Sequence, residues 1–97
     1  MIELKSVNFE VFGKVQGVFF RKYTQENANK LGLNGFVQNT SRGTVIGVLE
    51  GESSAIENMK SWLKNTGSPM SLIENVSFTN EKTIQKSSYN GFNIIRD

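Results

Sequence analysis

The chain passes from a strand into a helix at Gly13-Lys14-Val15-Gln16-Gly17-Val18-Phe19-Phe20-Arg21. Apolar residues alternate just before this stretch, which predicts a strand over residues 6–12. Glycines let a backbone bend so that several N–H groups point at one spot, and such a nest beside a helix N-terminus binds anions. Arg21 can grip the same anion with two hydrogen bonds. We therefore interpret the stretch as a phosphate cradle.

The rest of the sequence predicts one α+β domain over residues 1–97. A capping box at Ser54-Ala55-Ile56-Glu57 opens a second helix, and Gly67 and Pro69 end it. Periodicity and turn residues predict the other elements: a helix over 20–31, strands over 33–39 and 44–51, a strand around 76–78 and a closing strand around 92–94. This order is the split β-α-β, or ferredoxin-like, pattern, in which two helices cover one face of an antiparallel sheet.

Composition removes several kinds of chemistry. The 97 residues include no Cys and no His, and the one Asp is Asp97. A thiolate nucleophile, a histidine base and a disulfide framework are therefore excluded. The glutamates show no metal-ligand spacing beyond the pair Glu50 and Glu52, so we expect no bound metal. An enzyme of this composition would work through positioning and electrostatics.

Charge and hydropathy predict a small cytoplasmic protein. The net charge of +2 is too mild to indicate nucleic acid, and suits small anionic ligands. No apolar run approaches the roughly 18 residues of a membrane span, and the N-terminal residues lack the apolar stretch of a signal peptide. We expect no membrane insertion and a monomer.

The predicted topology brings Arg21 and Asn39 together. In a β-α-β unit the two strands run parallel, so their ends lie on the same edge of the sheet. The loop before Arg21 leaves the first strand at that edge, and Asn39 ends the second strand there. Lys14, Lys22 and Arg42 should surround the same edge and add a positive field for an anion.

Two motifs then resemble the signatures of the acylphosphatase family. The stretch from Gly13 to Arg21 is similar to the first signature. The stretch Gly35-Phe36-Val37-Gln38-Asn39-Thr40-Ser41-Arg42-Gly43-Thr44-Val45 is similar to the second. The resemblance covers nearly the whole chain and is strongest to the small eukaryotic enzymes. At Phe19 it favours the organ-common type over the muscle type.

The resemblance implies metal-independent hydrolysis of the carboxyl-phosphate bond of a small acyl phosphate, with inorganic phosphate as a product and no cofactor. It assigns phosphate binding to Arg21 and water positioning to Asn39 as the catalytic residues. The cradle would be formed by loop amides at Val15, Gln16, Gly17, Val18, Phe19 and Phe20. Gln38 and Arg42 depart from the residues of some members, but neither is a catalytic position.

Two other functions are weighed against this one. RNA-recognition modules share the architecture, but they stack bases on exposed aromatic side chains, and residues 44–49 carry none. A non-catalytic phosphate-binding domain of the same fold is the second alternative. The presence of both Arg21 and Asn39 argues against it.

Overall fold

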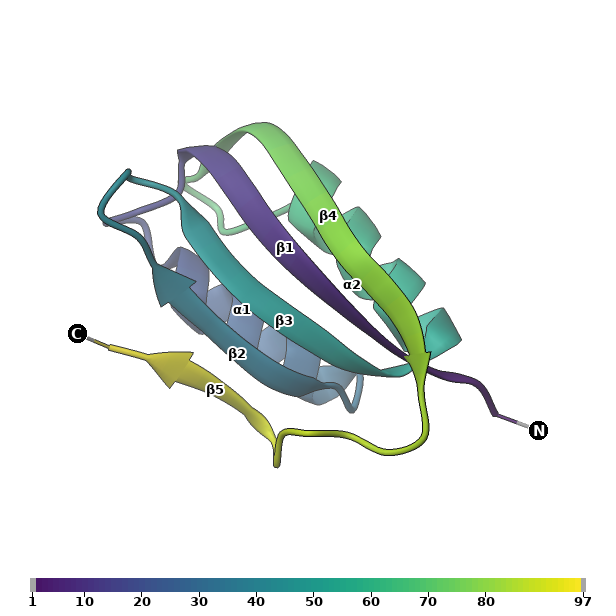
Figure 1. The fold of residues 1–97 in the computed structure, drawn as a ribbon. Helices are drawn as coiled ribbons and strands as arrows, with labels where there is room; N and C mark the ends of the chain where they lie inside the picture. The colour runs from purple at the N-terminus through teal and green to yellow at the C-terminus, as the bar shows by residue number, and fades with distance from the viewer. Residues whose placement is uncertain (1, 97) are drawn as a thin grey trace.

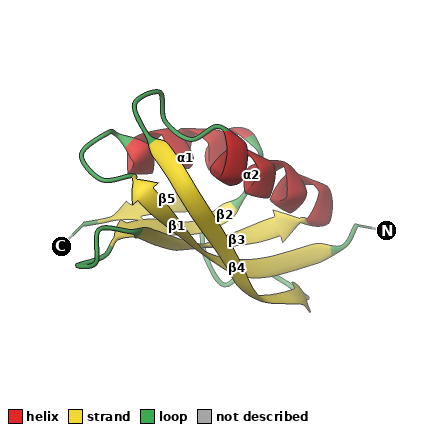
Figure 2. Cartoon of the chain, turned by 90° about the horizontal axis from the view of Figure 1, so that it is seen from above, coloured by secondary structure: helices red, strands yellow, loops and turns green. Residues whose placement is uncertain are grey.

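Two helices pack on one face of a five-stranded sheet in the computed structural model, which describes residues 2–96 (Figures 1 and 2). The opposite face of the sheet carries no helix. The elements follow in the expected order: β1 (Leu4–Lys14), α1 (Phe20–Lys30), β2 (Asn34–Asn39), β3 (Val45–Glu52), α2 (Ser53–Asn65), β4 (Leu72–Ile84) and β5 (Phe92–Ile95). The ferredoxin-like α+β fold is therefore confirmed.

The sheet has the strand order β4-β1-β3-β2-β5. As expected, β3 lies antiparallel between β1 and β2. The closing strand departs from the all-antiparallel expectation, because β5 pairs parallel with β2 and makes the sheet mixed. After β4 the chain crosses the end of the sheet before turning back along β2, which imposes this direction (Figure 1).

The start of α2 differs from the prediction. The helix begins at Ser53, and its N-cap residue Glu52 forms no side-chain capping bond. The predicted capping box at Ser54 is therefore wrong. Since β3 runs directly into α2, there is no free turn in which Ser54 could act as a cap, and the N–H of Ser53 instead donates to the carbonyl of Glu3 at 2.9 Å. The predicted end of the helix is confirmed, because Thr66 is its C-cap and Gly67 follows.

The core lies between the helices and the sheet. Alternating residues of β1 and β3 point into it, and they are fully or almost fully buried: Val7, Phe9, Val11, Val45 and Leu49. Helix α2 contributes Ile56, Met59 and Leu63. Helix α1 has a thin apolar stripe, and one of its buried residues is the polar Thr24. The hydroxyl of Thr24 is satisfied because it donates to the carbonyl of Phe20 at 2.7 Å.

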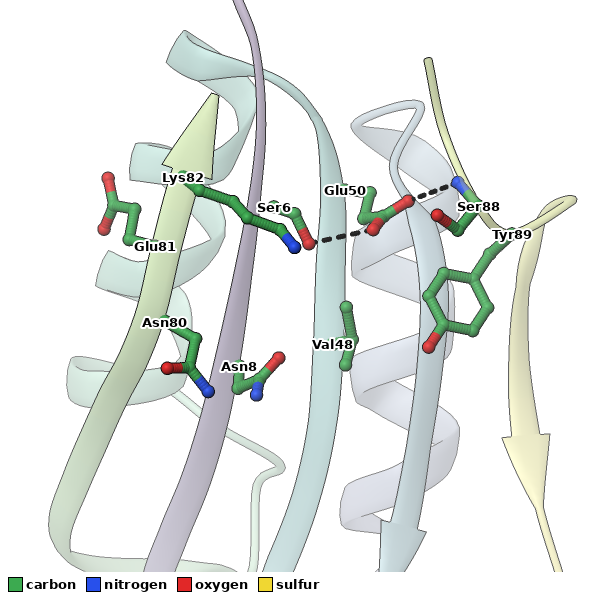
Figure 3. Close-up of a pocket in the computed structure, with 9 residues that line it drawn as sticks. All are labelled: Ser6, Asn8, Val48, Glu50, Asn80, Glu81, Lys82, Ser88 and Tyr89. Atoms are coloured by element: carbon green, nitrogen blue, oxygen red, sulfur yellow. Dashed lines mark hydrogen bonds between the residues drawn. The ribbon is translucent and has the colours of Figure 1, made fainter. Parts of the chain in front are cut away.

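A buried carboxylate holds the β4–β5 connection against the open face of the sheet (Figure 3). Glu50 is 4% exposed. It accepts hydrogen bonds from the Ser6 hydroxyl at 2.8 Å, the Ser87 hydroxyl at 3.0 Å and the Ser88 N–H at 2.7 Å. Glu50 is thus satisfied by hydrogen bonds within the fold, and we assign it to fixing the path of the chain into β5 rather than to ligand binding.

We expect Leu49→Ala to lower the free energy of unfolding by about 2–5 kcal/mol, because it leaves a cavity in a fully buried position. Leu72→Ala is the matched control, since this side chain is 67% exposed, and should change stability by less than about 0.5 kcal/mol. Urea denaturation measures both. Equal losses would contradict the assigned core.

Candidate active site

The strand register places the C-terminal ends of β1 and β2 at the same end of the sheet, which is the edge referred to here. Val11 of β1 and Asn39 of β2 both pair with Val45 of the intervening strand. The phosphate loop, defined here as residues 15–20, therefore begins beside Asn39. This confirms the predicted juxtaposition of the two motifs.

A cavity of about 550 Å³ opens at this edge, and both Arg21 and Asn39 line it. The phosphate loop contributes Val15, Gly17, Phe19 and Phe20 to its wall. Two other predicted residues do not line it. The side chain of Val18 is buried in the core, and that of Gln16 is bonded to the β2–β3 turn.

Strand β5 supplies a wall that the sequence did not predict. Ile94 and Arg96 line the cavity, together with Gln25 of α1. Ile94 of β5 and Arg96, which follows β5, reach the cavity because β5 runs parallel to β2, with Ile94 paired to Val37. The sequence signals the closing strand but not its pairing partner, so the positions of Ile94 and Arg96 could not be derived from it.

The phosphate loop presents a run of unused backbone donors. The N–H groups of residues 16–22 find no hydrogen-bond acceptor among residues 2–96. Gly17 has φ +74°. Phe19 has φ 59° and ψ 26°, a left-handed conformation immediately before α1, and its side chain is 72% exposed. A strained non-glycine residue of this kind costs about 1–3 kcal/mol and is typical of functional sites. Unpaired donors beside the first turn of a helix are the arrangement expected of an anion-binding nest, and we use the word nest for them below.

The two glycines of the first motif have different tasks. Gly17 lies in the nest. Gly13 lies within β1, where a Cβ atom would come within 2.1 Å of the Leu72 carbonyl oxygen. Gly13 therefore allows β1 and β4 to approach, and does not shape the cradle directly.

Gln16 ties the phosphate loop to the turn after Asn39. Its Nε2 donates to the carbonyl oxygens of Thr40 and Thr44, both at 2.8 Å. These bonds fix the nest relative to the end of β2. The side chain of Gln16 thus links the phosphate loop to the turn that follows Asn39.

Asn39 has an unsatisfied amide oxygen. Its Oδ1 is buried and has no hydrogen-bond partner within the described part of the chain. A buried polar atom in this state requires a partner from solvent or ligand, and an amide can accept and donate at once. The arrangement suits the binding of a water molecule inside the cavity.

The cavity is cationic. Arg21, Lys22 and Arg96 line it, and no carboxylate from residues 2–96 does. Lys14 and Arg42, which were expected around this edge, are absent from its lining. Arg42 instead forms an ion pair with Glu10, at 2.7 Å between Nη2 and Oε2.

The site offers no cluster of metal ligands. Among residues 2–96, no three His, Cys, Asp or Glu side chains lie close enough to hold an ion. The chemistry open to these residues is the binding of a phosphate group by N–H donors and Arg21, with a water molecule held at Asn39. The same described residues contain no helix that is long and apolar enough to cross a membrane.

Sequence comparisons identify similar proteins over nearly the whole chain. The acylphosphatase family model matches residues 7–94. The chain is 55% identical to acylphosphatase-2 of Bos taurus over 94% of this chain and 92% of that protein. It is also 55% identical to acylphosphatase-1 of Homo sapiens, over 96% and 94% of the two chains. Because the two identities are equal, they do not show which type of acylphosphatase the chain resembles more. The resemblance to the organ-common type therefore stays a prediction.

The fold is shared with a solved structure of the same family. The crystal structure of acylphosphatase from Bacillus subtilis superposes with a TM-score of 0.87 at 34% sequence identity. The match covers 95% of this chain and 99% of the other. The structural similarity thus extends over nearly the whole chain.

We expect Gly17→Ala to weaken the binding of inorganic phosphate, because it strains the nest. Gly32→Ala is the matched control: Gly17 and Gly32 have φ +74° and +73°, and neither has atoms crowding a new Cβ. Both changes should destabilise the fold by about 1–2 kcal/mol, measured by urea denaturation. Isothermal titration with phosphate should detect weakened binding only for Gly17→Ala. Equal phosphate affinities would remove Gly17 from the cradle.

Proposed function

The chain belongs to the acylphosphatase family, and we propose that Arg21, Asn39 and the phosphate loop carry out its reaction. That reaction is the hydrolysis of the carboxyl-phosphate bond of a small-molecule acyl phosphate, which yields a carboxylate and inorganic phosphate. The 55% identity to acylphosphatases supports catalysis over a non-catalytic phosphate-binding domain. RNA binding is also disfavoured, because Phe9 is 3% exposed and unavailable for base stacking.

In this proposal the phosphate group sits in the nest of residues 15–20 beside Arg21. Phosphoryl transfer spreads negative charge over three equatorial oxygens in a loose transition state. Preorganised N–H donors and a guanidinium aimed at those oxygens stabilise that charge without rearrangement during the reaction. The support is the run of unpartnered N–H groups from residues 16–22 and the position of Arg21 in the same cavity.

Asn39 would hold the attacking water. An amide does not take up a proton near neutral pH, so its task is orientation: Oδ1 accepts from the water and aligns it with the phosphorus and the leaving carboxylate. The substrate phosphate accepts the water's proton, and the carboxylate is a good leaving group that needs no acid. The single observation that carries this assignment is the buried, unpartnered Oδ1 of Asn39 in the cavity that Arg21 lines.

We further propose that residues 1–97 form one acylphosphatase domain that acts as a cytoplasmic monomer without a cofactor. One continuous core unites the helices and strands, which supports a single domain. Among the described residues, the large exposed apolar side chains are spread over several elements, as is typical of a monomer.

Arg21→Gln and Asn39→Ala should distinguish phosphate binding from water positioning when the hydrolysis of an acyl phosphate is assayed in the presence of EDTA. Arg21→Gln removes charge stabilisation, so we expect kcat/KM to fall about 10²–10³-fold and inhibition by phosphate to weaken. Asn39→Ala should lower kcat about 10²-fold while phosphate inhibition is largely kept. Lys30→Gln, an exposed change at the far end of α1, is the control. An active Asn39→Ala would refute its role, and an inert wild type would favour the binding domain.

The pH dependence tests whether a protein group transfers the proton. Without His or Cys in the sequence, we expect no side chain in the cavity to titrate between about pH 5 and 8. The value of kcat at saturating substrate should therefore stay flat over this range, apart from any ionisation of the substrate itself. A bell-shaped profile centred near pH 7 that substrate ionisation does not explain would contradict the mechanism.

A further inference from the structure

Glu10, on strand β1, is hydrogen-bonded to the β2–β3 turn, defined here as residues 40–44. Its Oε2 accepts one hydrogen bond from Arg42 Nη2 at 2.7 Å and another from Thr44 Oγ1 at 2.6 Å. These bonds hold the pKa of Glu10 below its ordinary value, the Thr44 bond contributing most and the Arg42 bond next. Glu10 is therefore an ionised acceptor at neutral pH.

An ionised Glu10 fixes the direction of a chain of hydroxyl groups. A carboxylate can only accept, so the single hydroxyl proton of Thr44 is used on Glu10. The Thr40 and Thr44 hydroxyl oxygens lie 2.7 Å apart, and Thr40 must therefore donate to Thr44. The Thr40 oxygen in turn accepts the N–H groups of Arg42 and Thr44, both at 3.2 Å. One carboxylate thus sets the direction of both hydroxyl donations, from Thr44 to Glu10 and from Thr40 to Thr44.

The same turn supports both halves of the active site. Thr40 follows Asn39 directly, and its N–H donates to the Thr44 carbonyl at 2.9 Å, which closes the turn behind Asn39. The carbonyls of Thr40 and Thr44 also receive Gln16 from the phosphate loop. A shift in the turn would therefore displace Asn39 relative to the bound phosphate.

We propose that Glu10 is a positioning residue for hydrolysis, which holds Asn39 in line by anchoring Thr44. The inference rests on the proposed role of Asn39. Glu10 does not line the cavity, so it acts through the turn and touches neither substrate nor water. The phosphate nest has further supports in the buried side chains of Val15, Val18 and Phe20, so the loss of Glu10 should disturb the water more than the phosphate.

The bond to Thr44, rather than the ion pair with Arg42, carries this effect. The Arg42 side chain is 65% exposed, and exposed ion pairs contribute little. Thr44 is 7% exposed, where a charge-assisted hydrogen bond is strong and its loss leaves a hydroxyl without its acceptor. The inference therefore predicts different results for changes at Glu10 and at Arg42.

The test compares kcat at saturating acyl phosphate with the inhibition constant of inorganic phosphate, each per folded molecule. We expect Glu10→Ala to lower kcat about tenfold with little change in phosphate inhibition. Glu10→Gln should restore most of the rate, because its amide oxygen can still accept from Thr44. Thr44→Val, which removes the hydroxyl, should match Glu10→Ala. The double variant should be no slower than either single one, as expected for residues acting through one bond.

Two variants serve as controls. Arg42→Ala should keep kcat within about twofold of wild type. Glu81→Ala removes a carboxylate that bridges Lys5 and Lys60 near the opposite end of β1, so it should cost stability without changing kcat. Urea denaturation shows how much of each variant is folded under assay conditions.

A folded Glu10→Ala with wild-type kcat would overturn the inference. So would weakened phosphate inhibition at unchanged kcat, because that pattern assigns Glu10 to the nest. Additive losses in the Glu10 and Thr44 double variant would also overturn it. Asn39→Ala, measured alongside, separates the two proposals. If that variant is active, the role of Asn39 itself has failed; if it is inactive while Glu10→Ala is normal, only the role of Glu10 has failed.

Discussion

The antiparallel insertion of β3 between β1 and β2 is the constraint on which the active site depends. Val45 pairs with Val11 on one side and with Asn39 on the other. One row of the sheet therefore sets where the phosphate loop begins and where Asn39 stands. A register slip of one residue would turn the side chain of Asn39 to the other face, and the buried residues that alternate along β3 resist such a slip. Core packing and the geometry of the site are thus fixed by the same pairing.

The site combines backbone donors with few side chains. The nest depends on the path of residues 16–22, whose N–H groups have no acceptor within residues 2–96. Local strain at Phe19 is tolerated because Phe20, the next residue, is buried in the core. Gln16 and the β2–β3 turn then lock the nest to Asn39. The proposed mechanism needs neither histidine nor cysteine, because in it the site orients and stabilises the reactants without forming covalent bonds to them.

Much of this arrangement could be predicted from the sequence, because it follows from local patterns and one handedness rule. Alternation in β1 and helical spacing in α2 gave the correct elements, and the right-handed β-α-β crossover placed Arg21 and Asn39 at one edge. The features that were missed depend on contacts distant in sequence. The capping box at Ser54 failed because β3 runs directly into α2, and the N–H of Ser53 donates to the carbonyl of Glu3. Arg42 turns to Glu10, and β5 brings Arg96 to the cavity through a pairing that no local pattern encodes.

The cavity wall links catalysis to the order in which its segments are synthesised. The cavity draws on β1's loop, on β2 and on β5, which lie near the beginning, the middle and the end of the described chain. Its last wall depends on Glu50 holding residues 87 and 88 so that β5 can reach the β2 edge. Pairings between such distant segments require the closure of long loops, which is costly in entropy. A chain emerging from the ribosome therefore carries the cradle sequence early but gains the finished cavity only when β5 docks on β2. The onset of turnover would then report that β5 has docked on β2.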